Sequence, residues 1–141
     1  MSNELATVTP ATIANADAGT TYCSIQAQPS DRDAATKVYN ALNDPDHRIN
    51  DFINKDIMVT DVLIEMVELA NEDTGIVDKC PRVVLIDENG ESYVSVSVGM
   101  LNSVKNAMLC FGEAPWTPAL VFSIVQKPTK NGSMLTAKVH G

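Results

Sequence analysis

The chain has 141 residues and a formal net charge of −8, from 10 Lys and Arg residues against 18 Asp and Glu residues. This length is typical of one domain that buries a core without disulfides or metals, and no apolar run reaches the roughly 20 residues of a membrane-spanning helix. The first residues also lack the pattern of a secretory signal, a basic stretch followed by an apolar one. Composition therefore excludes an integral membrane protein, and the acidic balance argues against a protein that holds duplex DNA by bulk attraction.

The charges are unevenly distributed along the chain. Residues 56–113 contain eleven acids and three cations, whereas residues 114–141 contain three lysines and no acid. These lysines are Lys127, Lys130 and Lys138. They either keep exposed strands soluble or form one cationic surface on a negative chain.

Residues suited to catalysis or metal binding form no recognisable motif. Cys23, Cys80 and Cys110 have no metal-like spacing, and their odd number predicts free thiols, with Cys23 and Cys110 buried as structural residues. His47 follows a solvated turn and His140 is the penultimate residue, so neither is placed as a general base. A Gly-rich phosphate loop and a nucleophile elbow are also missing from the sequence. We therefore expect no enzyme, no metal and no cofactor.

The first 55 residues are expected to form two parts. Residues 1–20 are rich in Ala, Thr and Asn without periodicity, which predicts a flexible N-terminal arm. Residues 21–55 are expected to add a strand and a short helix to the main domain. Near-alternation over residues 20–27 indicates the strand, and an N-cap at Ser30 and Asp31 precedes apolar residues at helical spacing, namely Ala35, Val38, Tyr39 and Leu42.

Residues 56–141 show the periodicity of five strands and one helix. The strands are predicted at residues 57–69, 82–86, 91–97, 120–125 and 134–139, and the helix near residues 100–110. The first strand is long and its alternation fails part-way, which predicts a bend where it changes faces. In the third strand, Val94 and Val96 are expected to face the core, with Tyr93, Ser95 and Ser97 pointing outwards. The helix should bury the stripe formed by Leu101, Val104, Met108 and Phe111.

The order strand, strand, strand, helix, strand, strand predicts a mainly β protein. It matches the five-stranded Greek-key barrel known as the OB-fold, with one helix between strands three and four, here preceded by the N-terminal strand and helix extension. OB-folds bind single strands on the face of strands two and three and on the flanking loops. The candidate DNA-binding residues are therefore Arg82, Tyr93 and Ser95 on that face, Lys127, Lys130 and Asn131 on the last hairpin, and Trp116, which either stacks with a base or caps the barrel end.

Several segments resemble a known family. The best pieces are residues 84–93, VLIDENGESY, and residues 126–135, QKPTKNGSML, supported by residues 37–42, 51–55 and 62–65. They are similar to the small single-stranded DNA-binding proteins of tailed phages and prophages, including those of protein-primed Bacillus phages, over about residues 33–139. The resemblance implies an OB-type barrel that coats single-stranded DNA during phage replication, in the cytoplasm of the infected bacterial host and without preference for base sequence.

Two other hypotheses stay open at this point. One is an OB-like structural or protein–protein assembly module that binds no nucleic acid, which the net charge of −8 favours. The other is a protein that binds or sequesters a small nucleotide. Salt separates the first of these from DNA binding, because phosphate contacts weaken as salt rises. We also expect a homo-oligomer, formed when the strand-like residues 22–27 add to the sheet edge of a neighbouring copy.

Overall fold

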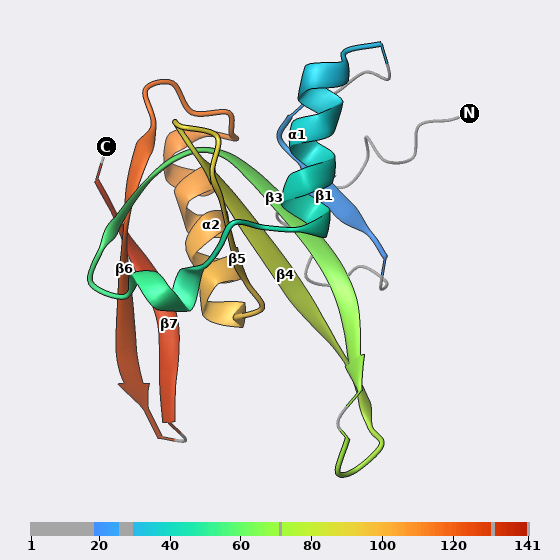
Figure 1. Ribbon diagram of the computed structural model, residues 1–141. Helices are drawn as coiled ribbons and strands as arrows, with labels where there is room; N and C mark the ends of the chain where they lie inside the picture. Colours follow the sequence, from blue (N-terminus) through green and yellow to red (C-terminus); the bar gives the residue numbers. More distant parts are fainter. Residues whose placement is uncertain (1–18, 26–29, 71, 131, 141) are drawn as a thin grey trace.

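The computed structural model describes residues 19–25, 30–70, 72–130 and 132–140, which form a curled sheet and two α-helices (Figure 1). The predicted flexible arm at residues 1–20 lies outside the described residues except for residues 19 and 20. In chain order the elements are β1 (Thr21–Cys23), α1 (Arg32–Asn43), β2 (His47–Arg48), the 3-10 helix η3 (Ile49–Phe52), β3 (Asp56–Ala70), β4 (Val77–Asp87), β5 (Ser92–Ser95), α2 (Val98–Phe111), β6 (Leu120–Thr129) and β7 (Gly132–His140).

The strands form one sheet in the order β2-β5-β4-β3-β6-β7, and β1 pairs with β3 beside this path. All pairs are antiparallel except the short pair between β2 and β5. Segments β3 to β7 correspond to the five predicted strands, and α2 lies between β5 and β6 in the chain. The result is a mainly β structure that is consistent with an OB-like fold.

The long strand β3 bends, as its sequence predicted. It pairs with β6 through residues 56–59 and with β4 through residues 59–70, so it belongs to both halves of the sheet. Its register with β4 shifts between Val59 and Asp61. Because Val59 and Val62 both lie in the main core, the inward side changes from odd to even positions across this irregularity.

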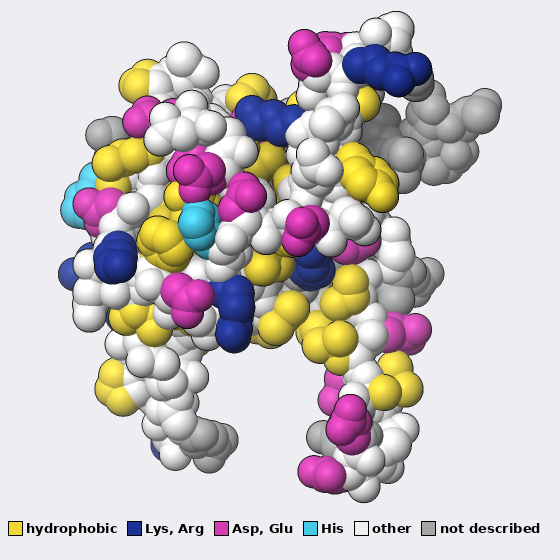
Figure 2. All heavy atoms as spheres, in the orientation of Figure 1, with side chains coloured by type: hydrophobic (Ala, Val, Ile, Leu, Met, Phe, Trp, Pro, Cys, Tyr) yellow, Lys and Arg dark blue, Asp and Glu magenta, His cyan; other side chains and the backbone are white. Residues whose placement is uncertain are grey.

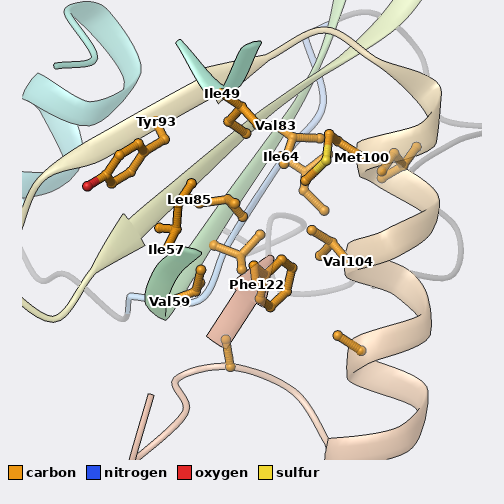
Figure 3. Packing of buried hydrophobic residues seen from close by; sticks show 14 of the residues in the cluster. Ile49, Ile57, Val59, Ile64, Val83, Leu85, Tyr93, Met100, Val104 and Phe122 are labelled. Carbon is orange, nitrogen blue, oxygen red and sulfur yellow. The ribbon is translucent and has the colours of Figure 1, made fainter. Parts of the chain in front are cut away.

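The main core fills the hollow side of the sheet, against α2 (Figure 3). Met100 and Val104 of α2 face buried side chains of three strands there, β3, β4 and β6, namely Ile57, Val59, Ile64, Val83, Leu85 and Phe122. The helix begins at Ser97, whose Oγ accepts a hydrogen bond from the Gly99 N–H at 3.1 Å. It ends at Gly112, which has a φ of 88° and therefore suits glycine.

The outer face of the sheet is covered by α1. Its side chains Val38, Ala41 and Leu42 pack with Leu63, Val84 and Ile86 in a second apolar cluster. Asp31 caps α1, and its side chain accepts from the Ala34 N–H at 3.2 Å. The helix α1 therefore lies against the outer face of β4 and β5, which are the second and third strands predicted from the sequence.

The predicted Greek-key closure is not seen. Among the described residues no ladder joins β5 to β7, and the first turns of α2 approach β7 instead. Ser97 Oγ donates to the Leu135 carbonyl at 3.4 Å, and the Ala137 N–H donates to Ser103 Oγ at 3.1 Å. A Cβ at Gly99 would stand 2.1 Å from the Leu135 carbonyl oxygen, so this close approach of helix to strand requires glycine.

Two further expectations concern the pairing of the N-terminal strand and the state of the cysteines. β1 pairs with β3 of its own chain, with Thr21 opposite Glu65, so these residues already have a sheet partner. All three cysteines are free thiols, as predicted. Cys110, however, is exposed rather than buried, because it lies near the end of α2, on the side towards the surface hollow described below.

Candidate nucleic-acid interface

The outer halves of β6 and β7 form a two-stranded arm, residues 126–130 and 132–135, here called the β6–β7 arm (Figure 1). Lys127 and Lys130 are exposed on it, and Lys127 lies opposite Met134. On the other side of the arm, Gln126 Nε2 donates to Ser133 Oγ at 2.9 Å. Since residues 114–141 contain no acid, both lysines extend into solvent without a neighbouring carboxylate on the same arm. Asn131 lies outside the described residues.

A second arm has the opposite charge. It consists of residues 68–70 and 72–79 of β3, β4 and their turn, here called the β3–β4 arm. It contains Glu68, Glu72, Asp73 and Asp78, with Lys79 as its cation. Figure 2 shows the two arms projecting to the same side with a gap between them, and acidic side chains on the β3–β4 arm. The charge separation seen in the sequence is thus also a separation in space.

Arg82 lies on the outer face of β4, where it was predicted, but it has a partner. Its Nη1 is 3.5 Å from Glu65 Oε1, and the two side chains are 19% and 32% exposed. The two residues are directly opposite each other on β4 and β3. A phosphate at Arg82 would therefore compete with a carboxylate that is already in place, although partly exposed pairs of this kind are weak.

Tyr93 is buried, and the prediction that it points outwards is wrong. It is 6% exposed, its ring stacks on His47 and meets Phe52 edge-on, each at 4.9 Å between centroids, and its hydroxyl donates to Asp87 Oδ2 at 2.7 Å. Burial, followed by the hydrogen bond to Asp87, raises the pKa of Tyr93 above its usual value. The ring offers no face to a base in this conformation.

The orientation of β5 is reversed because both of its faces are covered. On one face, β2 pairs with β5, and η3 follows β2 in the chain. His47 of β2 and Phe52 of η3 therefore enclose Tyr93. On the other face, Val94 packs against the cluster below α1, and Val96 beyond it is 50% exposed. Alternation identified which residues share a face, but a strand covered on both sides gives no signal of which face is inner.

Ser95 and Trp116 are also buried. Ser95 is 6% exposed, and its Oγ accepts from the Ser97 N–H at 3.1 Å, which shapes the turn into α2. Trp116 is 5% exposed, and its Nε1 donates to the Gly112 carbonyl at 2.9 Å. Its ring lies 5.9 Å from that of Phe122. Of the two alternatives considered for Trp116, the structure therefore favours the cap over the end of the curled sheet.

Two aromatic side chains that the sequence assigned to buried stripes are exposed. Tyr39 on α1 is 65% exposed, next to Arg32 along a shallow open groove. Phe111 is 49% exposed at the last turn of α2. Both lie at the margin of an apolar stripe, Tyr39 one residue after Val38 and Phe111 at the helix end. The position of each residue on its helix was the signal that could have predicted its exposure. Residues in the centre of an apolar stripe are buried more reliably than residues at its margins or ends.

Phe111 stands at the rim of a hollow of about 210 Å³ between α2 and β7, here called the α2–β7 slot. The residues that line it are Ser103, Asn106, Ala107, Cys110, Phe111, Thr136, Ala137 and Val139. Ser103 Oγ and Thr136 Oγ1 are 2.8 Å apart at its base. The slot thus combines an aromatic ring, an amide and hydroxyl groups at one place on the surface.

Neither a metal site nor a membrane-spanning helix is found in the part of the chain that the structure describes. No group of three or more His, Cys, Asp or Glu side chains there is placed to hold a metal ion. No helix in those residues is long and apolar enough to cross a membrane.

Comparison with known proteins gives one match. A family model described as phage single-stranded DNA-binding protein matches residues 15–139. Searches of curated proteins and of solved structures return no match.

Proposed function

The chain belongs to the phage single-stranded DNA-binding protein family, and from this premise we propose that it coats single-stranded DNA during phage replication, irrespective of base sequence. The observation that carries the proposal is the family match over residues 15–139. Coating is stoichiometric and requires no catalysis and no cofactor. It takes place in the cytoplasm of the infected host, on an OB-type scaffold of strands β3 to β7.

The phosphates are proposed to bind first at Lys127 and Lys130 of the β6–β7 arm. Both side chains are exposed, and the arm contains no acid to compete for them. Lys138 lies on the same two strands, opposite Ser123. Arg82 is proposed as a secondary contact, since a phosphate there must displace Glu65. Contacts of this kind are independent of sequence and release counterions.

The bases need aromatic surfaces other than Tyr93 and Trp116, which are buried. Base stacking requires an accessible ring face. Among the Phe, Tyr and Trp side chains, those of Tyr39 and Phe111 are exposed by about half or more and are the proposed platforms. Arg32 beside Tyr39 supplies a cation for an adjacent phosphate.

The test is a titration with oligo-dT over a series of salt concentrations. We expect affinity to fall as salt rises, and Lys127→Ala or Lys130→Ala each to reduce the magnitude of the log–log salt slope by roughly 0.7, the single-strand value per contact. Lys79→Ala is the matched control, because it removes an exposed lysine from the acidic β3–β4 arm and should leave the slope unchanged.

The parent protein decides between DNA binding and the assembly-module hypothesis. If the parent binds oligo-dT with no dependence on salt, or does not bind, the coating function is refuted. If the parent binds but both lysine variants keep the parental slope, the function stands and the β6–β7 arm is the wrong surface.

A further inference from the structure

We propose that the α2–β7 slot is a nucleobase site for the bound single strand, an inference that rests on the proposed function. The slot is a hollow at the surface between a helix and a strand that has no sheet partner on that side within the described residues. It is separate from the face of β4 and β5 where an OB-fold is expected to bind, which α1 covers here.

The walls of the slot are free of acids. In a chain with 18 Asp and Glu residues, none lies on α2, β6 or β7, while these elements and the turn between β6 and β7 contain four lysines. They are Lys105, Lys127, Lys130 in the turn between β6 and β7, and Lys138. Two acids lie next to these elements, and both are hydrogen-bonded: Glu113 Oε1 accepts from the Tyr22 hydroxyl, and Asp56 Oδ1 accepts from Ser123 Oγ of β6 at 2.6 Å. A polyanion can approach this surface without meeting an unpaired carboxylate on either wall.

The rim of the slot supplies a ring face for stacking and a carboxamide for hydrogen bonds to a base. Phe111 is half exposed and offers a ring face, and the exposed Asn106 has no side-chain hydrogen bond within the described residues. A carboxamide both donates and accepts, so it can pair with the edge of any base. The floor is fixed, because Ser103 Oγ bonds to the Gly99 carbonyl, the Ala137 N–H and Thr136 Oγ1. This combination suits recognition that tolerates every base.

The slot is continuous with the proposed phosphate contacts. Thr136 and Val139 line it, and Lys138 lies between them on β7. Lys127 lies opposite Met134, which is two residues from Thr136, or roughly 7 Å along a strand. One short segment of DNA can therefore place a base in the slot and phosphates on Lys138 and Lys127.

Cys110 makes the slot testable on the unmodified chain. Its thiol is exposed and lines the slot, whereas Cys80 lies on β4 near the β3–β4 arm. We expect saturating oligo-dT to slow alkylation of Cys110 by N-ethylmaleimide several-fold and to leave the rate at Cys80 unchanged, followed by peptide mass spectrometry. Equal rates at Cys110 with and without DNA would overturn the proposal.

A pair of variants tests the ring itself. Phe111→Ala should weaken oligo-dT binding roughly 5- to 150-fold, the loss expected for one stacked base, without changing the salt slope, because no phosphate contact is lost. Leu109→Ala is the matched control. Leu109 is 82% exposed on the same helix and does not line the slot, so its removal should leave affinity unchanged.

The outcomes separate this proposal from the function on which it rests. If the parent binds with a normal salt slope while Phe111→Ala binds equally well, the slot is refuted and the coating function stands. If the parent fails to bind, both the slot proposal and the coating function are refuted. Because Phe111 is exposed at a helix end, the variant should fold, and the Cys110 measurement needs no variant.

Discussion

Tyr93→Phe separates a structural role of this tyrosine from a role in stacking. The change removes the hydroxyl that donates to Asp87 Oδ2 and keeps the ring against His47 and Phe52. Asp87 is 7% exposed, and its other oxygen accepts from two backbone N–H groups of the turn after β4. A hydrogen bond to a charged group contributes roughly 1.5–3 kcal/mol. We expect the free energy of unfolding to fall by about that amount and Tm by roughly 3–12 °C.

The assay is urea unfolding of the parent and the variant, with oligo-dT affinity measured alongside. Affinity should be unchanged, because the ring is buried in both proteins. Tyr39→Phe is the control: that tyrosine is exposed, no hydrogen bond to its hydroxyl is seen in the described residues, and its loss should leave stability unaltered. A Tyr93→Phe variant with parental stability but weakened DNA binding would refute the structural role.

Two other predictions concern packing and pH. Gly99→Ala should lower the free energy of unfolding by about 1–3 kcal/mol, the usual cost of overpacking, because its Cβ would stand 2.1 Å from the Leu135 carbonyl. Alanine at an exposed position of the same helix should be harmless, and equal stability of the two variants would contradict the close approach. Stability should also fall above about pH 10, by up to about 1.4 kcal/mol per pH unit for each buried tyrosine, since burial raises the pKa of Tyr22 and Tyr93 in the folded protein and the unfolded chain ionises first. Urea unfolding at pH 8 to 11 checks this, and the doubly Phe-substituted chain should lose much of the dependence. An unchanged profile would contradict it.

The strands and the helix of residues 56–141 could be predicted from periodicity because most of these elements have one buried face. The helix stripe of α2 and the failing alternation of β3 are direct consequences of that geometry. The sheet edge between β5 and β7 could not be predicted. Whether two strands pair or a helix lies between them depends here on the close approach at Gly99, and a glycine near a helix start has many explanations.

The candidate site was harder to predict than the fold. Lys127 and Lys130 were placed on an exposed arm because charge and turn residues are local signals. Tyr93 was misplaced because His47 and Phe52, from a segment without periodicity, fold over its strand. Phe111 was predicted to be buried because it continues the apolar stripe of α2. It is exposed because the last turn of the helix is not covered at that position.

A chain of net charge −8 binds a polyanion most readily if its acids are kept away from the DNA. Glu68, Glu72 and Asp78 lie on the β3–β4 arm, apart from the β6–β7 arm. In water, two like unit charges about 15 Å apart repel each other by about 0.3 kcal/mol before screening, and by about 0.2 kcal/mol when the Debye length is about 30 Å. Replacing all three acids by their amides should therefore raise oligo-dT affinity roughly two- to threefold at low salt, where the Debye length is about 30 Å, and have almost no effect near 1 M, where it is about 3 Å. The measurement is the same titration on the triple variant, with unfolding curves to show that stability is kept. A gain that persists at 1 M salt would mean that the arm touches the strand directly, and no gain at low salt would mean that the DNA lies outside the field of the arm. Either result would contradict the proposal that the DNA follows the β6–β7 arm and is repelled, across the gap, by the acids of the β3–β4 arm.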